Sequence, residues 1–170
     1  WLVKSEPDCF SIQHLAKKYG ASPAQLAQGR ETLRQRGAEV GFTFGERPRV
    51  WNTFDAHRLL FWAGLEGRQR ELKHLLLKAY HTDAENPGAH DVLMRLAGEA
   101  GLDVERARAI LASDEFGAEV RERERHFQQL GISAVPAVII DERHLISGGQ
   151  PPEVFEQALR QIAAQALADG

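Results

Sequence analysis

The spacing of hydrophobic and polar positions predicts a chain that is mostly helical up to about residue 130. Apolar residues recur at helical intervals in successive segments, and Gly, Pro and capping residues separate these segments. The second segment has the clearest boundaries, with Ser22 as N-cap, Pro23 at the first helical position and Gly37 after the end. We expect helices over residues 10–20, 22–37, 52–67, 68–82, 86–101, 103–113 and 113–131.

Two segments interrupt or follow this helical pattern. Residues 38–50 contain two glycines and a proline, and Val40, Phe42 and Phe44 alternate as in an extended segment with one buried face. After residue 131, two β-branched runs, "AVPAVIID" and "HLISG", flank the polar turn "DERH", and a helical pattern begins at two prolines. The C-terminal part is therefore predicted to be a β-hairpin followed by a helix.

The most regular apolar spacing predicts the core. Phe54, Leu59, Leu60 and Trp62 lie near one side of the helix that begins at Asn52 or Thr53. The next helix carries apolar residues at the same spacing, namely Leu72, Leu75, Leu76 and Ala79. We expect these helices and their successors to form a compact α subdomain.

Composition excludes several classes of protein. The 170 residues are 43% hydrophobic and 26% charged, which are ordinary globular values, and no apolar run approaches the ~20 residues of a membrane span. A soluble, cytoplasmic protein is expected. The formal net charge of −3 provides no basic surface, so binding to nucleic acid is not predicted.

Candidate metal and thiol chemistry is sparse. The single cysteine, Cys9, excludes an internal disulfide and a cysteine-rich zinc site. His74 and His81 are seven residues apart, too far for the i, i+4 spacing of a helical zinc site, so no metal is predicted. The proline in "AVPAVIID", Pro136, lacks a backbone donor and must lie at the mouth of its strand.

Several segments together carry a family resemblance: "KKYGASPAQLAQ", "VGFTF", "RVWNTFDAHRLLFWA", "SDEFGAEVRERERHFQQLGISAVPAVIID" and "SGGQPPEVFEQAL". In order and spacing the chain resembles the DsbA-like thioredoxin family, in its FrnE-type branch related to 2-hydroxychromene-2-carboxylate isomerases and kappa-class glutathione transferases. The resemblance implies an α/β, mostly helical chain, a partial thioredoxin-like fold. A helical insertion would occupy residues 15–130, and residues 131–170 would form the C-terminal ββα half.

The resemblance also implies chemistry and site residues. The family performs thiol–disulfide exchange, so the expected ligand is a thiol or disulfide peptide or glutathione, with no other cofactor. Pro136 would be cis, and the backbone of Val135 would pair with the ligand; the alternative is a trans proline that ends a loop. Asn52, His57 and Arg58 belong to a segment that approaches the ligand in the family. Their alternative roles are helix capping for Asn52 and a solvated helix face for His57 and Arg58.

One departure from the family bears on activity. Thioredoxin-fold oxidoreductases need a Cys-x-x-Cys pair at a helix N-terminus, where the helix dipole lowers the thiol pKa. This chain has none, and only about fourteen residues precede the resemblance, whereas the family's first strand, dithiol helix and second strand should stand there. The sequence therefore predicts an N-terminally truncated member whose exchange activity is impaired or lost.

Residues 1–14 carry a second resemblance. "WLVKSEPDCFSI" resembles the start of an EVE domain, a β-rich module associated with modified nucleobases. Within it, Cys9 is the only candidate nucleophile. It could act as a monothiol catalyst, be glutathionylated or form an intermolecular disulfide. The alternative is that Cys9 is an unreactive, half-buried cysteine.

Three classes of function remain open from the sequence. They are a DsbA-like oxidoreductase, a noncatalytic module that binds peptide or glutathione, and an EVE-like nucleic-acid reader, for which the aromatic cage and barrel are missing. A two-stranded hairpin leaves open edges, so either "WLVKS" supplies a third strand or two chains pair their edges, and we expect a tendency to form a homodimer.

Overall fold

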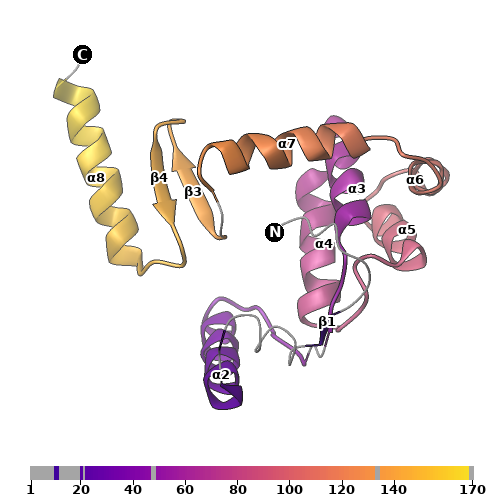
Figure 1. Ribbon diagram of the computed structural model, residues 1–170, viewed down its shortest axis with the longest axis horizontal. Coiled ribbons are helices and arrows are strands. Elements are labelled where there is room, and N and C mark those ends of the chain that lie inside the picture. Colours follow the sequence, from indigo (N-terminus) through magenta and orange to yellow (C-terminus); the bar gives the residue numbers. More distant parts are fainter. Residues whose placement is uncertain (1–9, 12–19, 21, 47–48, 133–134, 169–170) are drawn as a thin grey trace. The chain divides into compact units, whose positions relative to one another are not determined.

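The computed structural model describes residues 10–11, 20, 22–46, 49–132 and 135–168 (Figure 1). Its contacts divide the chain into two compact units, which are Val3–Glu122 and Arg123–Gly170 with Trp1–Leu2. The boundary falls within one helix, α7 (Gly117–Gln129). The larger unit is called the helical unit below, and residues Arg123–Gly170 are called the hairpin unit.

The helical unit begins with a short strand pair. β1 (Phe10–Ser11) lies antiparallel to β2 (Arg49–Val50), with Phe10 opposite Val50. The sequence predicts a helix over residues 10–20, but residues 12–19 of that helix lie outside the described residues. Phe10 and Ser11, the first residues of that predicted helix, lie in β1 instead.

Helix α2 (Pro23–Glu39) begins where the sequence predicts and ends later. Ser22 and Gln25 form a capping box: the Ser22 hydroxyl accepts from the Gln25 amide at 3.2 Å, and the Gln25 side chain accepts from the Ser22 amide at 2.8 Å. The prediction that Gly37 ends the helix is wrong, because Gly37 is a buried helical residue. A Cβ there would lie 2.5 Å from the carbonyl oxygen of Phe42, so its glycine serves close packing rather than helix termination.

The prediction of one buried face over Val40, Phe42 and Phe44 is only partly right. Val40 is the C-cap of α2 and is 80% exposed, and no strand is described between residues 40 and 46. Phe42 and Phe44 are half-buried and stack edge-to-face with centroids 4.8 Å apart, and the Phe44 ring also contacts His81. Two aromatic side chains, not an alternating strand, therefore anchor this segment on the helices.

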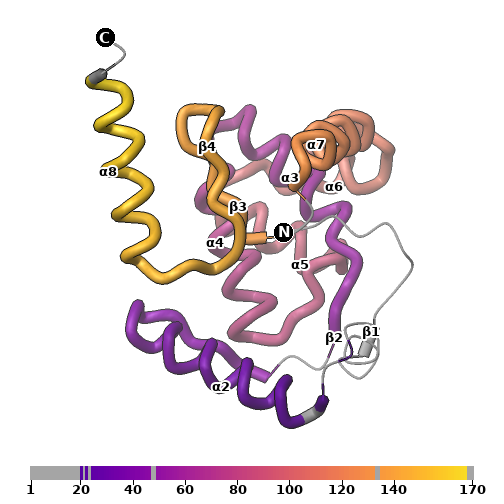
Figure 2. Tube along the Cα trace, turned by 60° about the vertical axis from the view of Figure 1, so that its left-hand side comes forward, coloured from indigo at the N-terminus to yellow at the C-terminus, as the bar shows by residue number. Residues whose placement is uncertain are grey.

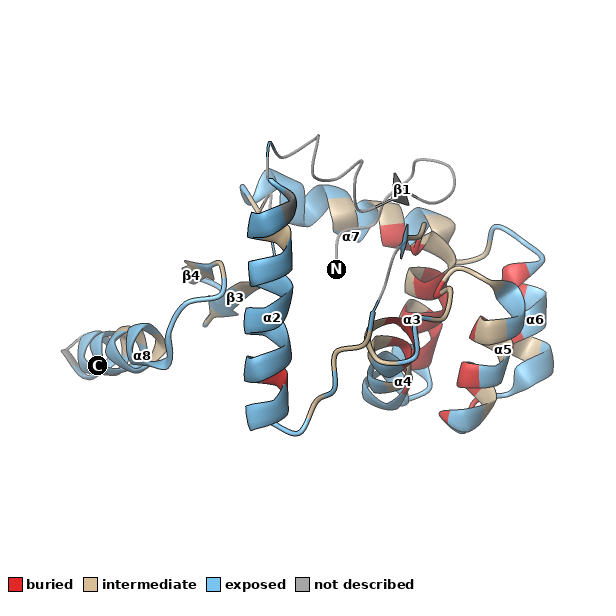
Figure 3. Cartoon of the chain, turned by 90° about the horizontal axis from the view of Figure 1, so that it is seen from below, coloured by how far each residue is buried: buried red, intermediate tan, exposed pale blue. Residues whose placement is uncertain are grey.

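The core lies among four helices. These are α3 (Phe54–Leu65), α4 (Gln69–His81), α5 (His90–Glu99) and α6 (Val104–Leu111), and they pack α3 on α4 and α5 on α6. As predicted, Leu59, Leu60 and Trp62 are buried, as are Leu72, Leu76 and Ala79 of the next helix, whereas Phe54 and Leu75 are half-buried. Figure 3 shows the buried positions concentrated on these helices. The apolar stripes predicted from the sequence are thus the faces that meet in the core.

The hairpin unit contains the predicted hairpin and terminal helix. β3 (Ala137–Ile140) pairs antiparallel with β4 (His144–Ser147), with Ala137 opposite Ser147 and Ile140 opposite His144. Helix α8 (Pro152–Ala168) follows and has Pro152 at its first position, where a missing N–H costs nothing. Figure 2 traces the chain from the hairpin into α8.

The two units differ in their cores. Among the described residues, the buried apolar side chains all lie between Ala56 and Val120, and no residue described from 123 onward is buried. Across the described part of the chain, no helix has the length and hydrophobicity to cross a membrane. The structure thus confirms a mostly helical chain that ends in a hairpin and a helix.

Candidate functional site

Val135 and Pro136 directly precede β3, as the sequence predicts from the missing backbone donor of Pro136. Val135 is 50% exposed, Pro136 is exposed, and the peptide bond between them is cis. The Pro136 carbonyl accepts a hydrogen bond from the Gly148 amide at 2.8 Å, which extends the hairpin ladder by one residue pair beyond Ala137 and Ser147.

This last bond determines which backbone groups of β3 face outward. In an antiparallel pair, hydrogen-bonded and non-hydrogen-bonded residue pairs alternate. Because Pro136 and Gly148 form a hydrogen-bonded pair, Ala137 and Ile139 lie at non-hydrogen-bonded positions. Their N–H and C=O groups therefore point away from β4. Among the described residues, no hydrogen bond engages the Val135 amide or carbonyl.

Asn52 acts as a cap in the helical unit. Its side-chain oxygen accepts a hydrogen bond from the Phe54 amide at 2.9 Å, whereas Thr53, the residue at the N-cap position of α3, forms no side-chain cap bond. The capping role that the sequence left open for Asn52 is therefore observed.

A cavity of about 450 Å³ opens beside this cap. It is lined by two aromatic rings, two amides, a carboxylate and a glycine, from Trp51, Asn52, Phe54, Asp55, Asn86 and Gly88. Two guanidinium groups lie over its aromatic rings: that of Arg121 is 4.1 Å from the Phe54 ring centroid, and that of Arg49 is 5.6 Å from the Trp51 centroid. The Asn52 segment thus borders a space large enough for a small ligand.

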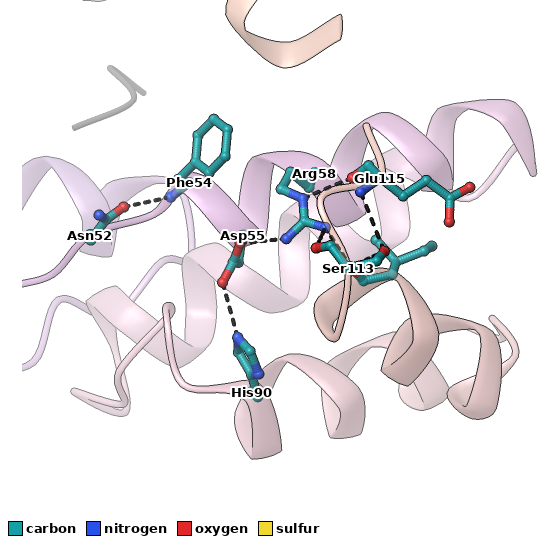
Figure 4. A network of polar contacts seen from close by, with 8 residues as sticks. Asn52, Phe54, Asp55, Arg58, His90, Ser113 and Glu115 are labelled. Atoms are coloured by element: carbon teal, nitrogen blue, oxygen red, sulfur yellow. Dashed lines mark hydrogen bonds and ion pairs between the residues drawn. The ribbon is translucent and has the colours of Figure 1, made fainter. Parts of the chain in front are cut away.

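Arg58 is buried and lies at the centre of a polar network (Figure 4). Its Nε donates to the Glu115 carbonyl at 2.8 Å, one terminal nitrogen donates to Asp55 Oδ1 at 2.8 Å, and the other donates to the carbonyls of Ile110 and Ser113. The alternative that Arg58 lies on a solvated helix face is wrong. Its guanidinium ties α3 to the turn between α6 and α7.

Two further ion pairs extend this network. Asp55 Oδ2 lies 3.0 Å from His90 Nε2 at the start of α5, and the Glu115 carboxylate pairs with Arg106 of α6. The hydrogen bond from Arg106 lowers the pKa of Glu115, and the same contact raises the pKa of Arg106. Sequence reasoning missed Asp55 and His90, because these two residues are 35 positions apart along the chain and no local spacing indicates their contact.

His57 is half-buried on α3. Burial lowers its pKa from 6.5 to about 4, and the positive charge of Lys73 acts in the same direction. The imidazole of His57 is therefore neutral at physiological pH.

This shift predicts a pH-dependent stability. Between pH 6.5 and pH 4 the unfolded chain binds a proton at His57 that the folded chain does not bind, so unfolding becomes more favourable as the pH falls. We expect roughly 1–2 kcal/mol to be lost from the free energy of unfolding between pH 7 and pH 5. Urea titrations of wild type and His57→Gln measure it, and the variant should lose less stability over this interval.

A matched control separates this effect from the other histidines. His74 is exposed on α4, and His74→Gln, measured over the same pH interval, controls for the loss of a histidine as such. Equal slopes for wild type and His57→Gln would contradict the prediction.

The candidate residues therefore fall into two groups. Asn52, His57 and Arg58 belong to the helical unit, and Val135 and Pro136 belong to the hairpin unit. Cys9 and the start of the EVE-like stretch lie outside the described residues, so the predictions for them stay open. Over the described ranges, no three His, Cys, Asp or Glu side chains are placed to hold a metal ion.

Comparisons with known proteins show the family and the fold. A probable DsbA oxidoreductase from Streptomyces coelicolor has a similar structure, with a TM-score of 0.83 and 37% sequence identity over 91% of this chain and 68% of its own. No curated protein matches the chain significantly. The sequence matches the DSBA-like thioredoxin domain over residues 10–160, which confirms the predicted thioredoxin-like fold with a helical insertion. The chain belongs to the DsbA-like thioredoxin domain family.

Proposed function

We propose that the protein binds an extended cysteine-containing peptide or glutathione at Val135, as a DsbA-type protein of thiol–disulfide exchange. The ligand backbone pairs with the amide and carbonyl of Val135, and Pro136 holds this residue at the mouth of β3. The proposal takes its reaction class from the family and from the probable DsbA oxidoreductase that the chain resembles.

The exposed backbone position of Val135 carries this proposal. Val135 is 50% exposed, and no hydrogen bond among the described residues engages its amide or carbonyl. An added strand needs such a donor and acceptor, because main-chain hydrogen bonds supply the affinity in this mode of recognition. The side chain of Val135 contributes an apolar contact beside them.

Turnover is a separate matter from binding. Exchange requires a thiolate that attacks one sulfur of a disulfide and releases the other sulfur as a thiolate, and a second protein cysteine then resolves the mixed disulfide. These 170 residues contain one cysteine, Cys9, and no Cys-x-x-Cys pair. We therefore propose that this polypeptide binds the ligand but exchanges disulfides slowly or not at all. The alternative function is a noncatalytic module, which binds the same ligand and carries out no thiol–disulfide exchange.

Peptide binding tests the recognition step. The probe is a fluorescently labelled extended peptide whose cysteine is S-methylated, so that binding is measured without chemistry. Val135→Pro removes the amide donor of Val135, and we expect the Kd to rise roughly tenfold, the value of about one hydrogen bond. Val135→Ala is the matched control, since it keeps both backbone groups and should change the Kd less. Equal affinities for wild type and Val135→Pro would overturn the proposal.

Exchange is tested by insulin reduction, and by intact mass before and after oxidised glutathione, for wild type and Cys9→Ser. We expect both proteins to be nearly inert in insulin reduction. Turnover by wild type that disappears in Cys9→Ser would show instead that Cys9 is a monothiol catalyst.

We place this function in the cytoplasm, where a single cysteine stays reduced, and cell fractionation tests that placement.

A further inference from the structure

We draw no further inference here: the strongest candidate, the cavity beside the Asn52 cap at the start of α3, is bordered by the segment that approaches the ligand in the DsbA-like family, so a ligand proposed for it would restate a property of that family.

Discussion

Replacement of Arg58 by methionine should lower the free energy of unfolding by about 3–5 kcal/mol, the cost of removing one partner from a buried charged network. Urea unfolding followed by circular dichroism at the helical bands measures the change. A loss below about 1 kcal/mol would show that the Arg58 contacts do not hold the helical unit together.

The expected size follows from what Arg58 leaves behind. Its guanidinium donates to the Asp55 carboxylate and to three backbone carbonyls, those of Ile110, Ser113 and Glu115. Methionine fills much of the same volume but donates nothing, so these acceptors lose a partner in a region that water enters poorly. Since the three carbonyls lie at the end of α6 and in the turn before α7, we expect that turn to loosen first.

Arg95 provides the matched control. It also forms two side-chain pairs, with Glu99 at 2.7 Å and with Glu85, but its own side chain is 45% exposed. Exposed pairs contribute little because water and salt screen them. Arg95→Met should therefore lower the free energy of unfolding by less than about 1 kcal/mol. An equal loss for Arg58→Met and Arg95→Met would mean that burial does not determine how much these contacts stabilise the fold.

Much of the architecture was predictable because it depends on local physics. The apolar spacing of Leu72, Leu76 and Ala79 needs only the helical period, and the capping box at Ser22 needs only neighbouring residues. Gly37 misled the prediction because a glycine that ends a helix and a glycine that permits close packing look alike in sequence. The carbonyl of Phe42, which decides between them, approaches only after the chain has turned.

The candidate site shows the same division. Pro136 indicated the mouth of β3 because a residue without an N–H has few places in a hairpin. Arg58 looked equally suited to a solvated face or to a ligand site, since the three backbone carbonyls that bury its guanidinium lie more than fifty residues away along the chain. No spacing rule connects residues so distant in sequence, and only the packing of α3 against the α6–α7 turn reveals the contact.

Truncation of Leu59 to alanine should lower the free energy of unfolding by about 2–5 kcal/mol, whereas the same change at Leu145 should cost less than about 1 kcal/mol. Leu59 is fully buried among the helices, so its loss leaves a cavity as well as the lost burial. Leu145 is 47% exposed on β4, and its surroundings contain no closed core in which a cavity could form. Urea unfolding at low protein concentration measures both changes without a contribution from chain pairing. Comparable losses would mean that the hairpin unit contributes to the same core as the helices, and would contradict a core confined to residues 56–120.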